Sequence, residues 1–199
     1  MSTLELKDVS YSYTEDAKVL SHVSLSVTQG QRIALLAPSG FGKSTLCKLA
    51  AGFLEPDTGE VLFSGKPLPK KGVCPVQMIW QHPEHAIDPL ITIRSSLEEA
   101  GPIDFELLRR VGVKEEWLSR YPRELSGGEL QRCCIARALR VKPQFIIADE
   151  ISTMLDAITQ VQIWDVLLSY AKEENIGMLL VTHSNALTKR IATETYELL

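Results

Sequence analysis

The sequence has no apolar run that approaches the roughly 20 residues needed to span a bilayer. It has no arm rich in Lys and Arg, and its net charge of −4 gives no indication of nucleic-acid binding. Its first residues lack the basic segment followed by an apolar one that marks a signal peptide. We therefore expect a cytoplasmic chain without a membrane span and without a nucleic-acid partner.

Cysteine is scarce, and no pair of the four cysteines has the spacing of a metal site. The neighbours Cys133 and Cys134 would point in different directions on a helix, so a local disulfide is not expected. We interpret Cys47, Cys133 and Cys134 as small buried hydrophobic residues in a reducing compartment.

A chain of 199 residues with 45% hydrophobic and 23% charged residues suits one globular domain with a full core, or one domain plus a small appendage. The hydrophobic periodicity alternates between strand and helix patterns. It predicts an α/β fold with a largely parallel central sheet flanked by helices. Strands are expected at 4–13, 19–27, 33–36, 60–65, 76–80, 144–148 and 178–182, and helices at 46–53, 126–139 and 158–171, the last closed by Gly177.

A glycine-rich stretch at 37–45, APSGFGKST, lies between an expected strand and an expected helix. Gly40 and Gly42 can adopt backbone angles closed to other residues and let the main chain approach an anion closely. Free N–H groups and the positive end of the helix dipole then face phosphates. Lys43 can reach the terminal phosphates, and the Ser44 hydroxyl can ligate magnesium. This stretch predicts a nucleotide phosphate site.

Ala37 departs from the usual phosphate-loop pattern, which begins with Gly. The extra methyl group matters only if this position needs a positive φ angle. A cassette that binds ATP without turnover therefore stays open as an alternative.

Four polar residues follow expected buried strands: Gln81, Asp149, Glu150 and His183. In α/β sheets ligands bind beyond the carboxyl ends of the strands, where the phosphate loop also lies. We therefore expect these side chains and the loop to form one site.

The stretch Ser126-Gly-Gly-Glu129 has the Ser-x-x-Glu pattern of a helix N-terminal capping box. Two glycines in a first turn each cost about 1 kcal/mol of helix propensity relative to Ala. Bare backbone at a helix start suits a second phosphate-binding surface.

Taken together and in this order, the motifs resemble those of the nucleotide-binding subunits of ABC transporters over nearly the whole chain. The resemblance implies a P-loop NTPase fold of ABC type with an N-terminal antiparallel β part, and the cofactors ATP and magnesium. Asp149, Ser44 and Gln81 would hold magnesium. Glu150 would act as general base, with His183, Lys43 and Gln81 in the catalytic site.

The resemblance also implies a head-to-tail dimer with ATP between one subunit's phosphate loop and the other's Ser126, Gly127 and Gly128. Asp156 matches the loop that crosses the dimer interface, although Ile151 and Met154 replace the more usual Pro and Ala. Further nucleotide contacts are expected from Tyr13 (stacking on adenine, with Tyr11 in reserve), Ser39, Gly40, Phe41, Gly42 and Thr45.

The expected domains are an ATP-binding core (1–81 and 126–199) and an inserted helical subdomain (82–125) that contacts integral membrane subunits. The protein would then lie peripherally on the inner face of the cell membrane. The stretch from Gln81 resembles that of peptide and nickel importers, and to a lesser degree that of vitamin and metal importers. Peptide and nickel ATPases continue beyond the matching histidine with a further extension, and whether one follows Leu199 in this protein stays open. A soluble, non-transport ABC ATPase is the other alternative, and homodimer versus heterodimer stays open.

Overall fold

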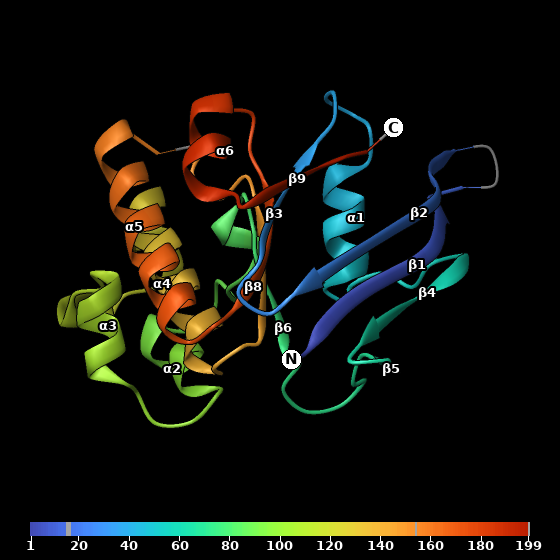
Figure 1. Ribbon diagram of the computed structural model, residues 1–199. Helices are drawn as coiled ribbons and strands as arrows, with labels where there is room; N and C mark the ends of the chain where they lie inside the picture. Colours follow the sequence, from blue (N-terminus) through green and yellow to red (C-terminus); the bar gives the residue numbers. More distant parts are fainter. Residues whose placement is uncertain (15–16, 154, 199) are drawn as a thin grey trace.

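The computed structural model describes residues 1–14, 17–153 and 155–198, and within them the chain forms two β-sheets with helices around them (Figure 1). The strands are β1 (Thr3–Ser12), β2 (Lys18–Thr28), β3 (Arg32–Leu36), β4 (Thr58–Phe63), β5 (Lys66–Pro67), β6 (Val76–Ile79), β7 (Phe145–Asp149), β8 (Gly177–Val181) and β9 (Glu194–Glu197). Five parallel strands form one sheet in the order β6-β7-β8-β3-β9. The antiparallel sheet has the order β2-β1-β4-β5. The expected fold class is confirmed.

The α-helices of the described residues lie on different sides of the parallel sheet. They are α1 (Lys43–Ala50), α2 (Ile93–Glu98), α3 (Phe105–Val111), α4 (Gly127–Arg140), α5 (Ala157–Glu173) and α6 (Asn185–Ile191). Helix α1 lies between the two sheets, whereas α4, α5 and α6 cover the other face of the parallel sheet (Figure 1). The short helices α2 and α3 lie beside α4.

The side chains of the central strands point alternately to the two faces of the parallel sheet, which explains why helices cover both faces. In β7, Phe145 and Ile147 belong to the core shared with α1 and the antiparallel sheet, whereas Ile146 and Ala148 pack toward α4 and α5. Successive side chains of a strand point to opposite faces, so a strand that is apolar throughout needs cover on both faces. Both cores therefore meet at the strands whose ends form the site.

Helix α4 is tied to the segment between β6 and α4 by side chains that donate to backbone carbonyls. Arg132 Nη1 donates to Val111 O at 2.8 Å, Arg137 Nη1 donates to Ala86 O at 3.1 Å, and Arg140 donates to Pro102 O. Carbonyls in loops and at the end of α3, which lie outside the regular hydrogen-bond ladders, thereby find partners.

The prediction that Cys47, Cys133 and Cys134 are buried is confirmed. Burial raises the pKa of the Cys47 thiol well above its ordinary value, and it raises those of Cys133 and Cys134 to about 12. No helix among the described residues has the length and apolarity that crossing a membrane requires.

The prediction that Gly177 closes the last long helix is wrong. Helix α5 ends at Glu173, Asn175 takes the left-handed conformation with φ 53°, and Gly177 begins β8. A Cβ atom on Gly177 would lie 2.4 Å from the Phe145 ring and 2.7 Å from the backbone oxygen of Thr28. Glycine is needed here because the neighbouring strands approach closely.

We expect Gly177→Ala to lower the free energy of unfolding by about 1–3 kcal/mol, the usual cost of overpacking a core. The Phe145 ring is fully buried and packs edge-on against Phe63, so it has no room to move aside. Urea denaturation measures the loss. In a Phe145→Leu background the cost of Gly177→Ala should be smaller, and an equal cost in both backgrounds would contradict the proposed clash.

Candidate active site

The phosphate loop joins β3 to α1 and depends on two left-handed glycines. Gly40 and Gly42 both have φ 83°, and Gly42 is the N-cap residue of α1. A Cβ atom on Gly42 would lie 2.9 Å from the side chains of Val19 and Leu20. Backbone conformation and packing therefore both demand glycine at position 42.

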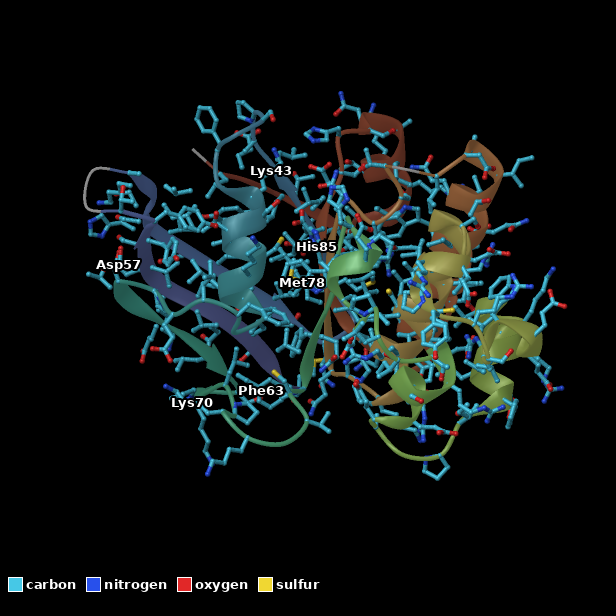
Figure 2. All side chains as sticks on the ribbon, turned by 180° about the vertical axis from the view of Figure 1, so that it is seen from behind. Lys43, Asp57, Phe63, Lys70, Met78 and His85 are labelled. Atoms are coloured by element: carbon cyan, nitrogen blue, oxygen red, sulfur yellow. The ribbon has the colours of Figure 1, made fainter. Side chains whose placement is uncertain are left out.

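Lys43 is the first residue of α1 and lies at the end of this helix that meets the loop (Figure 2). Its side chain turns back to the loop backbone. Its ammonium donates to the backbone oxygens of Ala37 at 2.8 Å and Pro38 at 2.9 Å. Ala37 is not among the residues with positive φ, and its methyl group packs on the core around α1. The missing glycine therefore costs this loop no backbone strain.

The Glu150 carboxylate is held from two sides. Its Oε2 accepts a hydrogen bond of 3.2 Å from Gln81 Nε2, and its Oε1 lies 2.7 Å from His183 Nε2. Three parallel strands supply these groups, because Gln81 follows β6, Glu150 follows β7 and His183 follows β8. Since a carboxylate offers about four acceptor positions, both oxygens keep capacity for a water molecule.

Glu150 adopts a conformation that is unusual for a residue with a side chain. Its φ is 50°, and its backbone N–H donates to Val181 O at 3.0 Å. The side chain is 13% exposed, whereas that of His183 is 54% exposed. A non-glycine residue in this region costs of order 1–3 kcal/mol and persists where its surroundings hold it, often at functional sites.

Asp149 is the buried last residue of β7, and its Oδ1 has no hydrogen-bond partner in the part of the chain that the structure describes. Burial raises the pKa of its carboxyl, the Ser44 hydroxyl lowers it, and the Glu150 carboxylate raises it. A buried carboxylate oxygen that is unpaired beside a hydroxyl fits a magnesium ion, which prefers oxygen ligands and keeps part of its hydration shell. The described residues hold no cluster of three His, Cys, Asp or Glu that could bind a metal alone. Phosphate oxygens and water would therefore complete the set.

A pocket of about 320 Å³ gathers many of the expected residues. Its lining includes Tyr13, Ser39, Gly40, Gly42, Lys43, Ser44, Thr45, Glu150 and His183. The Tyr13 hydroxyl lies 3.1 Å from Thr45 Oγ1, and its ring, half exposed, meets that of Tyr11 edge-on at 5.1 Å. Phe41 lies beside this pocket with a side chain exposed to 52%.

The Ser126 end of α4 is absent from the lining of this pocket, as far as the described residues show. Ser126 caps the helix in a reciprocal box: its N–H donates to Glu129 Oε2 at 2.8 Å, and the Glu129 N–H donates to its Oγ at 3.4 Å. These bonds hold the pKa of Glu129 below its usual value. Gly127 has open space around its Cβ position and no positive φ, whereas a Cβ on Gly128 would meet Thr159 at 3.3 Å. The fold of this chain therefore does not explain Gly127.

The segment after Glu150 has structural roles in its own chain. Ile151 is buried, and the Ser152 hydroxyl accepts from Gln160 Nε2 and from Trp164 Nε1. Asp156 is the N-cap of α5 and accepts from the backbone N–H groups of residues 158 and 159. Met154 lies outside the described residues.

Gln131, on α4, is a polar residue near the site that the motifs did not single out. It is 1% exposed, and its Nε2 donates to the backbone oxygen of Trp80 at 3.3 Å. The sequence did contain one indication of its burial: Gln131 lies on the expected helix among the apolar residues Leu130, Cys134 and Ile135.

Comparisons with known proteins identify the family of this chain. Residues 20–153 match the family described as "ABC transporter". The nickel import ATP-binding protein NikE of Brucella suis is 39% identical over 193 residues, which cover 87% of this chain and 73% of that protein. NikE of Rhodospirillum rubrum is 36% identical over 193 residues, covering 86% and 69%.

Two solved structures share the fold. One, of an ATP-binding subunit of an ABC transporter, has a TM-score of 0.82 at 27% identity and covers 98% of this chain and 85% of its own. The other, a dimeric ATP-binding cassette with bound ADP and Pi, has a TM-score of 0.82 at 24% identity and covers 98% and 93%. The chain belongs to the ABC transporter family and is one of its ATP-binding, ATP-hydrolysing subunits.

Proposed function

We propose that this chain hydrolyses magnesium-bound ATP in a head-to-tail dimer and thereby drives import through separate membrane subunits. The observation that supports this most strongly is the Glu150 carboxylate, fixed between Gln81 and His183 beside the phosphate-loop pocket. The names of the NikE relatives favour nickel as cargo. The stretch from Gln81 also resembles that of peptide importers, so a peptide or a similar small solute belongs to the same proposal.

In this proposal Glu150 is the general base for the attacking water. One carboxylate oxygen polarises the water while the contacts with Gln81 and His183 keep the carboxylate in line with the γ-phosphate. Lys43 leaves the loop carbonyls and binds the terminal phosphates, together with the N–H groups of the loop. Phosphoryl transfer depends chiefly on such positioning and charge stabilisation.

Magnesium fits the buried Asp149 oxygen and the neighbouring Ser44 hydroxyl. We assign it to Asp149, Ser44 and Gln81, where it would neutralise charge on the phosphate oxygens. Tyr13, at the open side of the same pocket, is our choice for stacking on adenine, because its exposed ring offers a π face.

The second half of each site comes, in this proposal, from the partner subunit. Ser126 and Gly127 are exposed at the start of α4, and Gly128 beside them is half-buried, an arrangement that suits an anion at the positive end of a helix dipole. Gly127 is unexplained by its own chain, and a closely approaching phosphate accounts for it. We assign Asp156 to the same interface, in addition to its capping of α5.

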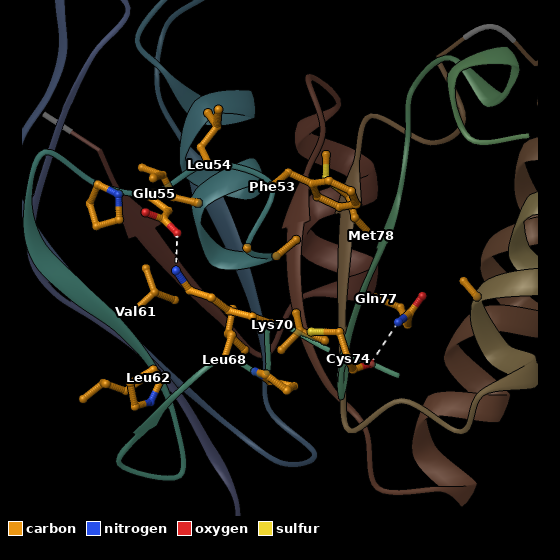
Figure 3. A pocket seen from close by; sticks show the side chains of 18 of the residues that line it. Phe53, Leu54, Glu55, Val61, Leu62, Leu68, Lys70, Cys74, Gln77 and Met78 are labelled. Atoms are coloured by element: carbon orange, nitrogen blue, oxygen red, sulfur yellow. Dashed lines mark hydrogen bonds and ion pairs between the residues drawn. The ribbon is translucent and has the colours of Figure 1, made fainter. Parts of the chain in front are cut away.

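We assign the contact with the membrane subunits to the inserted segment 82–125, apart from the core formed by 1–81 and 126–199. Leu90 in this segment is 82% exposed. Next to the segment, a groove of about 520 Å³ between the two sheets is walled by apolar side chains such as Phe53, Leu54 and Leu68 (Figure 3). The chain would then lie peripherally on the inner face of the cell membrane.

Glu150→Gln should lower ATP hydrolysis at least a hundredfold, because an amide cannot accept the proton of the attacking water. ATP binding should persist, and a dimer should accumulate in the presence of ATP. Phosphate release and size-exclusion chromatography measure the two effects. The control Glu194→Gln changes an exposed carboxylate on β9 and should leave the rate unchanged. Equal phosphate release by Glu150→Gln and parent would remove Glu150 from its role.

Ala37→Gly should change ATP affinity by less than about tenfold, or 1.4 kcal/mol. The reason is that Ala37 already has a relaxed backbone, so glycine relieves no strain. Titration with ATP measures the affinity. A larger gain would show that the natural alanine impairs the loop.

A further inference from the structure

The buried side-chain amide of Gln131 lies between the Ser126 end of α4 and the strand end that carries Gln81. The side chain is 1% exposed and lies on α4, in the second turn after Ser126. Its Nε2 donates to Trp80 O at 3.3 Å, while its Oε1 is buried without a partner among the described residues. Burying an amide that is only half satisfied costs free energy, so packing alone is a poor reason for glutamine here.

The bond to Trp80 falls at the end of a strand. The pairing of β6 with β7 ends at Ile79 opposite Ala148, so the Trp80 carbonyl lies beyond the sheet ladder. Gln131 gives this carbonyl its donor. The next residue is Gln81, whose amide donates to Glu150 Oε2. Two hydrogen bonds in succession thus lead from α4 to the catalytic carboxylate.

The other hydrogen bonds of helix α4 to the rest of the chain go to the segment that follows Gln81 and to helix α5, where Arg132 Nη2 donates to Gln162 Oε1 at 2.7 Å. Arg132 and Arg137 donate to the backbone oxygens of Val111 and Ala86, and Arg137 Nη2 also pairs with Glu99 at 2.6 Å. Gln131 is different because its partner, Trp80, comes directly after the core strand β6 and directly before Gln81. A displacement of α4 would therefore shift the backbone at Trp80 through this bond, and with it the neighbouring residue Gln81.

We infer that Gln131 is a positioning residue that fixes the Trp80 carbonyl, aims the Gln81 amide at Glu150, and so links the Ser126 end of α4 to the catalytic carboxylate of its own chain. This inference rests on the proposed function. It extends that function by giving a physical connection between the surface that meets the partner's ATP and the base of the chain's own site.

The test is Gln131→Met, which keeps the side-chain length and removes the donor. We expect kcat for ATP hydrolysis to fall about tenfold, or 1.4 kcal/mol of transition-state stabilisation, with little change in KM. In a Gln81→Ala background the same substitution should have no further effect, because its route to Glu150 is already broken. If Gln131→Met does not fold, Gln131→Asn withdraws the amide by one methylene group and serves the same test.

The matched control is Gln77→Met on the same strand, β6. Gln77 Nε2 also donates to a backbone oxygen, that of Cys74, at 2.9 Å (Figure 3). Gln77 lies near the start of β6, whereas Trp80 and Gln81 follow the other end of that strand. This variant should keep the parent kcat.

Two results would overturn the inference: an unchanged kcat in Gln131→Met, or an equal loss in the parent and Gln81→Ala backgrounds. The latter is the behaviour of a residue that only stabilises α4. If Glu150→Gln abolishes hydrolysis while Gln131→Met retains it, the inference fails and the proposed function stands. If Glu150→Gln retains hydrolysis, the proposed function itself fails.

Discussion

The parallel pairing of β6, β7, β8 and β3 is the constraint on which the site depends. Parallel strands bring all their carboxyl ends to one edge of the sheet. The pairs Ile79↔Ala148 and Asp149↔Val181 set the register, so Gln81, Glu150 and His183 emerge next to one another. A slip of one residue in β7 would move the side chains of Asp149 and Glu150 each to the other face of the sheet. The Glu150 carboxylate would then be separated from both Gln81 and His183.

The sheet that assembles the Glu150 side of the site keeps the proposed second half, the Ser126 end of α4, away from the phosphate loop of the same chain. Helix α1 packs on one face and α4 on the opposite face, so the phosphate loop and the Ser126 end of α4 are held apart within a chain (Figure 1). The capping box between Ser126 and Glu129 rigidifies that end and leaves Gly127 exposed. The dimer that we propose, with each Ser126 end over the other chain's loop, would bring the two halves together.

Periodicity and motif order were enough to predict the fold class, the central strands and the residues at their ends, because buried parallel strands are apolar throughout. Strand β9 and helix α6 were not predicted, since Glu194-Thr-Tyr-Glu197 is mostly exposed at a sheet edge and has little apolar alternation. The prediction that Gly177 ends a helix was wrong. Glycine is needed at this position because the ring of Phe145, which is distant in sequence, leaves no space for a Cβ atom. Two further features could not be predicted from the spacing of residues in the sequence, because they join residues that are far apart along the chain. They are the contacts of Glu150 with Gln81 and His183, and the hydrogen bond from Gln131 to Trp80.

The most direct test of the two-half-site account is ATP hydrolysis by mixed dimers of two inactive variants. Lys43→Ala disables the phosphate loop, and Gly127→Asp places a negative charge where the partner's phosphates would bind. A mixed head-to-tail dimer has one doubly defective site and one intact site, so an equal mixture should recover to about a quarter of the parent rate. If each chain held a complete site of its own, the mixture would show no more activity than either variant alone, and that result would contradict the account.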